Sequence, residues 1–302
     1  MEREIEAGSF DSVNKALASF EESVRSFEKS SKDKKSFDEV VLPLERAEEE
    51  FGVIWRGLTH LTYVKNSEKV RDVHEKLLPE VIKVSSMASQ SPKILEALER
   101  VRGDDRDRIV EKRLQDMRMN GVGLPSDERD EFNANKTRLS ELSTQFANNV
   151  MDETKAFKMR LDESEVKGMT RSFLDSKRKG DHYEIGLDAP SYVEVMKSCT
   201  NREVREAMWR AYAARGGERN PEIISEILKI RKKQANLLGF DTHAELSVAK
   251  KMAGTIQNVN EMIEMLKKPA SKAAERELKH LLSFSDLNTF MPWDLTFESE
   301  RT

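Results

Sequence analysis

The sequence predicts an all-α protein, and three observations support this fold class. Glycine and proline are scarce, with 13 Gly and 8 Pro among 302 residues, while strong helix formers such as Glu, Lys, Leu and Ala are abundant. Apolar residues recur every three or four positions over long stretches, which is the period of one helix face. Helix-start signals recur between these stretches. At most one short β-hairpin is expected, near residues 156–187.

Composition also excludes several classes of protein. The chain has 51 Lys and Arg against 55 Asp and Glu, a net charge of -4, so it lacks the basic surplus of a nucleic-acid-binding domain. Its single cysteine, Cys199, excludes a disulfide scaffold. No apolar run reaches 18 residues, and the acidic start carries no signal-peptide pattern. We therefore expect neither a nucleic-acid nor a membrane partner.

The first half of the chain reads as successive amphipathic helices. Apolar stripes predict helices within 13–27 and 40–58, joined by a polar turn at 29–36. Ser67 is expected to cap the next helix, which Pro79 would kink or restart. Ser91-Pro92 predicts a further helix start. Another helix is predicted from the apolar spacing of Ile109, Leu114 and Met117, and it should end at Gly121 and Gly123. A long helix capped by Ser126 is expected next, with an apolar stripe made of Leu139, Leu142, Phe146, Val150 and Phe157.

The second half opens with the expected hairpin and continues as helices. Residues 156–161 and 182–187 are the two candidate strands, flanking a polar loop that contains the basic run 177–180. Three Ser/Thr-x-x-Glu capping boxes follow, at Ser191/Glu194, Thr200/Glu203 and Thr242/Glu245. With Asn220-Pro221 as a further start, the predicted helices are 191–198, 201–215, 221–238, 243–253 and 256–284, the last kinked by Pro269.

A search for metal-binding or catalytic patterns finds none. The five histidines are His60, His74, His182, His243 and His280, and no two are four residues apart, as a helical metal-binding pair requires. His74-Glu75 begins like a zinc-peptidase motif but has no second histidine. His243 and Glu245 point to nearly opposite sides of a helix, and His182 with Glu184 supplies only two ligands on one strand face.

The remaining polar patterns also favour structural roles. Cys199 is expected to be a free thiol in a packed helix, because no base lies at a recognised spacing from it. Asp104, Asp105 and Asp107 lack the glycine and glutamate of a calcium loop and read as an acidic first helical turn. Residues 121–123 do not form the glycine pattern of a dinucleotide-binding loop. The basic triplets 177–179 and 231–233 are expected to be solvent-exposed helix or loop faces. The spacing of Ile223, Ile227, Ile230 and Leu237 is that of core residues.

Five ordered segments carry a family resemblance. They are FDEVVLPLERAEEEFGVIWRGLTHLTYV (37–64), GVGLPSDERDEFNANKTRLSELSTQFANNVMDETKAF (121–157), GLDAPSYVEVMKSCTNREVREAMWRAYAARGG (186–217), NPEIISEILKIRKKQANLLGFDTHAELSVAKKMA (220–253) and PWDLTFESE (292–300). Together they resemble the amino-terminal half of the thimet oligopeptidase and oligopeptidase A family of zinc-dependent oligopeptidases. The resemblance extends over nearly the whole chain.

The resemblance implies a fold and a chemistry. Such enzymes are mostly helical, with two lobes around a channel that admits short peptides, and zinc is held by an H-E-x-x-H helix and a downstream glutamate. None of the five histidines matches that motif, so no catalytic, cofactor-binding or metal residue is assigned, and no zinc is expected on this chain. Residues 1–157 would form an amino-terminal helical lobe, and 158–302 a second helical segment, the start of the catalytic lobe, truncated before the zinc motif.

Three functional hypotheses follow. The first is a fragment of a zinc-dependent oligopeptidase, inactive alone, in the cytoplasm or alternatively the mitochondrial or plastid matrix. The second is a non-catalytic helical module that binds peptides or proteins, and the third is a plain helical scaffold. Under the first hypothesis, the 256–284 helix and the Pro292-Trp293 segment would lack their packing partners, and their exposed apolar surface would favour self-association.

Overall fold

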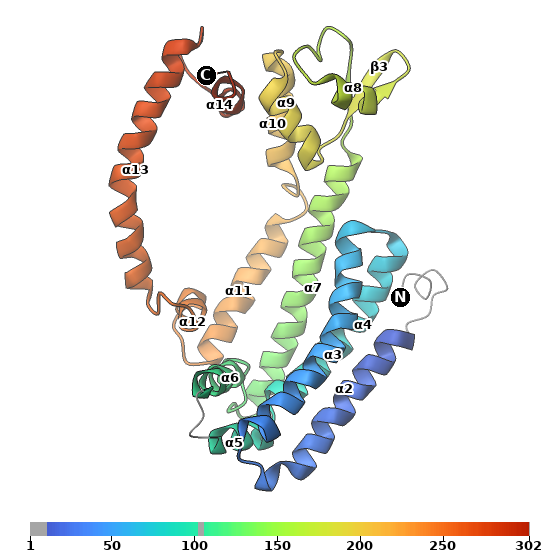
Figure 1. Ribbon diagram of the computed structural model, residues 1–302, viewed down its shortest axis with the longest axis vertical. Coiled ribbons are helices and arrows are strands. Elements are labelled where there is room, and N and C mark those ends of the chain that lie inside the picture. The colour runs from blue at the N-terminus through green and yellow to red at the C-terminus, as the bar shows by residue number, and fades with distance from the viewer. Residues whose placement is uncertain (1–10, 102–105, 302) are drawn as a thin grey trace. The chain divides into compact units, whose positions relative to one another are not determined.

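The structure, a computed structural model, describes residues 11–101 and 106–301, and most of this chain is helical (Figure 1). It contains two compact units. Unit 1 runs up to Glu141 and resumes over Lys229–Met252, and unit 2 comprises Leu142–Leu228 and the chain from Ala253 onward. In the described residues, no helix combines the length and apolar character needed to cross a membrane. The predicted all-α class is confirmed.

Unit 1 is built from helices of the amino-terminal half. Its elements are α2 (Asp11–Ser30), the 3-10 turn η1 (Ser31–Asp33), α3 (Phe37–Val64), α4 (Glu68–Ser89), α5 (Pro92–Arg100), α6 (Asp107–Met119), the first part of α7 (Ser126–Ala156), the last part of α11 (Pro221–Leu237) and α12 (His243–Val248). Helices α2, α3 and α4 lie side by side, drawn in blue in Figure 1.

The core of unit 1 follows most of the predicted stripes, although Ile109, expected on one stripe with Leu114 and Met117, is 45% exposed. Every apolar residue of the first stripe is buried, from Val13 to Phe27, and Phe20 stacks on Phe51 of α3 at 5.5 Å between ring centroids. Leu98 of α5 and Val110 of α6 complete the same core. The turn expected at 29–36 is confirmed and contains η1. These helices form because their apolar side chains share one face that only mutual packing can remove from water.

The helix boundaries of unit 1 are mostly those expected. The hydroxyls of Ser67 and Ser91 accept from the backbone amides three residues later, as N-caps do. A capping box between Ser36 and Glu39, which the sequence interpretation missed, starts α3. The expectation that Ser126 caps α7 is wrong by one position, because Ser126 is itself the first helical residue.

Two prolines lie inside helices of unit 1. Pro43 is in α3 and Pro79 is in α4, yet each helix is a single element. Of the two alternatives expected at Pro79, the restart is therefore wrong, and the kink stays a prediction. Buried residues on both sides of it, such as Leu77 and Val81, hold both halves of α4 against the core, which offsets the lost amide donor.

Unit 2 contains a small antiparallel sheet with strand order β1-β3-β2. The two expected strands are present but shorter, as β1 (Met159–Leu161) and β3 (His182–Ile185), with Arg160 opposite Glu184. The prediction of a polar loop between these strands is wrong, because the segment contains helix α8 (Arg171–Lys177) and strand β2 (Arg178–Lys179). The sheet therefore has one strand more than the expected hairpin. Tyr183 of β3 is buried in the core of unit 2, where the alternation of the strand places it.

Helices α8, α9 (Ala189–Ser198) and α10 (Arg202–Ala214) contribute side chains to this core. The other helices of unit 2 are the last part of α7, the first part of α11, α13 (Ile256–Phe284) and α14 (Pro292–Ser299). Helices α9, α10 and α14 pack against one another. Pro269 lies within α13, which is one continuous element.

Two of the three predicted capping boxes are wrong. Asp188, not Ser191, caps α9, because a proline favours the first helical turn and the helix therefore starts before Pro190. Asn201, not Thr200, caps α10, while the Thr200 hydroxyl donates to the carbonyl of Lys167. The box Thr242/Glu245 is confirmed, although α12 ends at Val248, earlier than expected.

Candidate functional site

The five histidines lie on five different elements. His60 is on α3, His74 on α4, His182 on β3, His243 on α12 and His280 on α13. Over 11–101 and 106–301, no three His, Cys, Asp or Glu side chains gather closely enough to hold a metal ion. The His182 ring contacts the Asp181 carboxylate at 2.9 Å, and the His280 ring lies edge-on to Phe284. These contacts are local and form no catalytic group.

His74 is a buried histidine of the unit 1 core. It is 6% exposed, and its ring stacks on Trp55 of α3 with 4.8 Å between centroids. Its Nε2 lies 3.4 Å from the Thr59 hydroxyl, whereas Nδ1 is buried without a partner. Burial lowers the pKa of His74, because a protonated imidazole would be a cation away from water. The residue is therefore a structural core histidine, and it makes folding sensitive to acid.

Lowering the pH from 7 to 5 is expected to destabilise unit 1 through His74. The unfolded histidine binds a proton near pH 6.5, and the folded one does so only at a lower pH, so stability is lost as pH falls through this window, by at most about 1.4 kcal/mol per pH unit. Urea unfolding followed by the helical circular dichroism signal measures this slope. His74→Phe should flatten it, and His60→Phe at an exposed position should not. An unchanged slope in His74→Phe contradicts the assignment.

Cys199 is buried, as expected for a structural thiol, but it is the residue following α9 and not a helical residue. Its Sγ lies 3.4 Å from the Glu165 carbonyl, and burial raises the pKa of the thiol. A thiol with a raised pKa is a poor nucleophile. Asp107 begins α6 as part of its acidic first turn, while Asp104 and Asp105 lie outside the described residues.

The basic triplets form local ion pairs. Lys177 lies 3.5 Å from the Asp188 carboxylate, and Arg178 lies 3.2 Å from that of Glu163. In the second triplet, residues 231–233 are exposed and Lys233 pairs with Glu131 at 2.9 Å. These carboxylates offset part of the positive charge of each triplet, and the role of solvated faces stays a prediction. Of the apolar set on α11, Ile223 and Ile230 are buried, whereas Ile227 and Leu237 are only half-buried.

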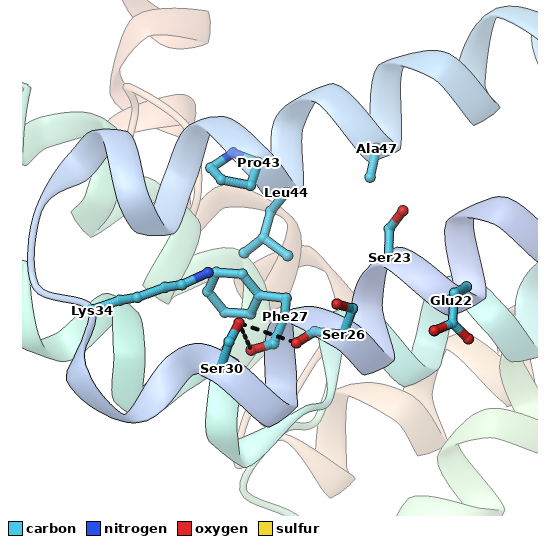
Figure 2. A pocket seen from close by; sticks show the side chains of 9 residues that line it. All are labelled: Glu22, Ser23, Ser26, Phe27, Ser30, Lys34, Pro43, Leu44 and Ala47. Atoms are coloured by element: carbon cyan, nitrogen blue, oxygen red, sulfur yellow. Dashed lines mark hydrogen bonds between the residues drawn. The ribbon is translucent and has the colours of Figure 1, made fainter.

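A pocket of about 410 Å³ lies between α2 and α3 (Figure 2). Lys34 lies across the ring of Phe27, with Nζ 4.6 Å from the centroid, and the Ser30 hydroxyl donates to the carbonyls of Ser26 and Phe27. The rest of the wall is lined by Glu22, Ser23, Pro43, Leu44 and Ala47. The lining residues contain no nucleophile paired with a base, so this pocket has no catalytic machinery.

A buried ion cluster joins α10 to α14. Asp294 is fully buried and accepts from Arg202 Nε and Nη2 at 2.9 and 2.7 Å and from Arg205 Nη2 at 3.1 Å. Arg205, itself 2% exposed, also donates to the carbonyls of Trp293 and Cys199. Burial by itself raises the pKa of Asp294, but the hydrogen bonds from Arg202, the Met291 amide and Arg205 together lower it below its ordinary value.

The sequence interpretation missed this cluster, which shows that the expected lack of a packing partner for Pro292-Trp293 is wrong. Trp293 is 4% exposed and packs against Trp209 of α10, so the Pro292-Trp293 segment does have a packing partner in this chain. The available signal was the pair Arg202 and Arg205, three residues apart on one helix face, together with an aspartate that follows Pro-Trp. The cluster connects α14 to α10, because the Asp294 carboxylate accepts hydrogen bonds from both arginines.

Helix α13 is different, because no residue in it is buried. Six large apolar side chains are at least 40% exposed, namely Met262, Ile263, Met265, Leu266, Leu278 and Phe284, and we call this set the α13 apolar surface. Its exposure confirms the expectation for the 256–284 helix. Met262, Ile263, Met265 and Leu266 are grouped within about one turn of α13, whereas Leu278 and Phe284 lie further along the helix. Grouped exposed apolar side chains mark interaction sites.

Two protein-family models match this chain. The model of the Neurolysin/Thimet oligopeptidase N-terminal domain matches residues 13–129, and the model of Peptidase family M3 matches residues 195–302. Over these two segments the chain is therefore similar to a class of peptidases.

Its relatives narrow the class to one family. The chain is 33% identical to Oligopeptidase A of Salmonella typhimurium over 293 residues, and 34% and 33% identical to Probable cytosolic oligopeptidase A and Organellar oligopeptidase A, chloroplastic/mitochondrial, of Arabidopsis thaliana. These matches cover 88% of this chain but only 43%, 42% and 37% of the relatives. The chain belongs to the thimet oligopeptidase and oligopeptidase A family and matches its amino-terminal half.

Proposed function

We propose that this chain supplies the non-catalytic helical part of a zinc-dependent oligopeptidase that hydrolyses short peptides, and that it is inactive alone. The observation that carries the proposal is its similarity, at about one third identity over 88% of its length, to proteins named oligopeptidase A. Residues 1–157 would form the amino-terminal helical lobe and 158–302 the beginning of the catalytic lobe. The names of the relatives support a cytosolic or an organellar location.

The residues of this chain do not fit a zinc centre. Zinc sites of peptidases need three protein ligands at bonding distance, and zinc there lowers the pKa of the bound water that attacks the peptide. The five histidines occupy separate elements, and in the described part of the chain no group of three ligand side chains exists. We therefore propose no catalytic, cofactor-binding or metal-binding residue here, and zinc would be held by other polypeptide.

The α13 apolar surface is the proposed contact for that polypeptide. A fully buried Leu, Ile, Met or Phe side chain contributes about 1.5–3 kcal/mol, so covering Ile263, Leu266 and their neighbours would stabilise an assembly. In the absence of that polypeptide, the same surface would favour self-association.

The chain alone is expected to show no chelator-sensitive hydrolysis of a quenched fluorescent oligopeptide in the presence of zinc. Co-expression with the part of Escherichia coli oligopeptidase A that this chain does not match should give chelator-sensitive turnover. Ile263→Asp should abolish that turnover by placing a charge on the α13 apolar surface, whereas Lys268→Asp, on the opposite face of α13, should not.

Two results would contradict this proposal. One is zinc-dependent turnover by the chain alone after contaminating proteases have been removed. The other is calorimetric binding of short unstructured peptides by the chain alone, combined with a coding region that has no H-E-x-x-H frame beyond codon 302. That combination favours the alternative function, a non-catalytic helical peptide- or protein-binding module.

A further inference from the structure

Lys136 of α7 is a partly buried cation that no carboxylate neutralises. Its Nζ donates to the Ser86 hydroxyl and to Asn120 Oδ1, both at 3.3 Å, and the ion pairs among the described residues do not include it. The four positions one helical turn away, at i±3 and i±4, are Phe132, Asn133, Leu139 and Ser140, none of them acidic. Burial lowers the pKa of Lys136, as expected for an ammonium group that lacks a counter-charge.

Two helix ends compensate this charge in part. Helix α4 ends at Ser89 and α6 ends at Met119, so both lysine contacts lie at helix carboxyl termini. The carbonyl groups there carry a partial negative charge, which favours a nearby cation. Partial charges leave the ammonium with a net positive field, unlike a carboxylate in direct contact.

A pocket of about 340 Å³ opens beside this group, between α4 and α7. The Ser86 hydroxyl, which accepts from Lys136, is part of its wall, together with Lys83, Gln90, Asn133 and Thr137. No Asp or Glu lines it, although the chain contains 55 acidic residues. Hydroxyl and amide donors beside an unneutralised cation are the chemistry that binds an oxyanion.

An amide pair fixes the donors of this wall. Gln90 Nε2 donates to the Asn120 carbonyl and to Asn133 Oδ1, both at 2.7 Å, and Asn133 Nδ2 donates to Gln90 Oε1 at 3.0 Å. Both amide protons of Gln90 are thus used, whereas Asn133 keeps one for a further acceptor. Gln90 and Ser86 are 7% and 3% exposed, so the wall is held in place by its surroundings.

We propose that this pocket binds a small oxyanion, a carboxylate or a phosphate group, through the field of Lys136 and hydrogen bonds from Ser86, Asn133 and Thr137. The site lies within unit 1 and is separate from the α13 apolar surface. A peptide carboxyl terminus and free inorganic phosphate share this chemistry. Neither the zinc centre nor the peptidase activity enters the argument, so binding can be tested on the chain alone.

Calorimetry on the purified chain tests the proposal with potassium phosphate and with a tripeptide whose carboxyl terminus is free or amidated, each against potassium chloride at matched ionic strength. Saturable binding of phosphate, or of the free but not the amidated peptide, is expected and identifies the source of the oxyanion. Lys136→Met should weaken it at least tenfold. Lys76→Met, which removes an exposed lysine from the same helix as Ser86, should leave it unchanged.

The pKa of Lys136 provides a second measurement, which distinguishes a lysine that takes part in anion binding from one with a structural role alone. An anion in the pocket would oppose the effect of burial, so the pKa of Lys136, followed by NMR of isotope-labelled lysine, should rise when the anion binds. Ser86→Ala and Thr137→Val provide variants that keep the lysine if Lys136→Met does not fold. No saturable binding beyond the chloride control, or equal binding by wild type, Ser86→Ala and Thr137→Val, overturns the proposal and leaves Lys136 a helix-terminus cation only.

Discussion

Replacing Asp294 with alanine is expected to destabilise unit 2 by about 3–5 kcal/mol, the range for removing one partner of a buried ion pair. Asp294 is fully buried and Arg205 is 2% exposed, so the substitution leaves a buried guanidinium without its counter-charge. It also removes an acceptor for Arg202 and for the Met291 amide. We therefore expect α14 to detach from α9 and α10 before the rest of the unit unfolds.

Denaturant unfolding of the variant, followed by tryptophan fluorescence, measures this effect. Trp209 and Trp293 pack together with 5.6 Å between ring centroids, so their emission reports the separation of α14 from α10. Asp175→Ala is the matched control, because its pair with Arg171 is solvent-exposed and such pairs contribute about 0–1 kcal/mol. If Asp294→Ala lowers the free energy of unfolding by less than about 1 kcal/mol, the ion cluster does not hold α14 against α10.

Replacing Gly168 with alanine is expected to cost about 2–5 kcal/mol, for two additive reasons. Its φ is +90°, a conformation that costs a residue with a Cβ about 1–2 kcal/mol. A Cβ there would also collide with the carbonyl oxygen of Ser198, a backbone atom that cannot rotate away, and overpacking of this kind costs about 1–3 kcal/mol. The variant should unfold at a lower denaturant concentration than wild type.

Gly180→Ala provides the comparison. Gly180 also has a positive φ, of +64°, but its added Cβ would meet no atom within 4 Å. It should therefore cost only the conformational part, about 1–2 kcal/mol. Equal losses in the two variants would mean that the contact with Ser198 contributes nothing and that φ alone explains the glycine.

Helix faces and helix caps could be predicted from the sequence, because both depend on interactions between residues that are close together in the chain. The stripe Val13, Leu17, Phe20, Val24 and Phe27 predicted a helix face, and all five residues are buried, because a 3.6-residue period needs no distant information. The caps at Ser67 and Ser91 were predicted for the same reason, since a cap involves only the next three residues.

Predictions failed where one residue had two possible partners. Thr200 has the right spacing to Glu203 for a capping box, but its hydroxyl donates to Lys167, 33 positions away, and Asn201 takes the cap. Strand β2 is stabilised by pairing with β3, so its two exposed residues carried no apolar pattern to detect. Tertiary contacts of this kind override local preference.

The absence of a zinc motif was readable from the sequence, but the structural and candidate sites were not. Arg202 and Asp294 are separated by 92 positions, and Lys136 reaches Ser86 across 50. Spacing arguments work for ligands on one helix and give no information about groups that only the folded chain brings together. The exposure of the α13 apolar surface was predictable only through the family resemblance.

The discontinuous composition of unit 1 has a consequence for folding during synthesis. Asp116 and Gln115 of α6 bond to Lys250 and to the Ala249 carbonyl, and Glu131 bonds to Lys233. Roughly 110 residues are made between Glu141 and Met252, which at 5–20 residues per second takes on the order of 5–22 s. A ribosome-bound chain therefore exposes an unfinished α6 surface for seconds, and a chaperone that shields it would raise the yield of folded protein.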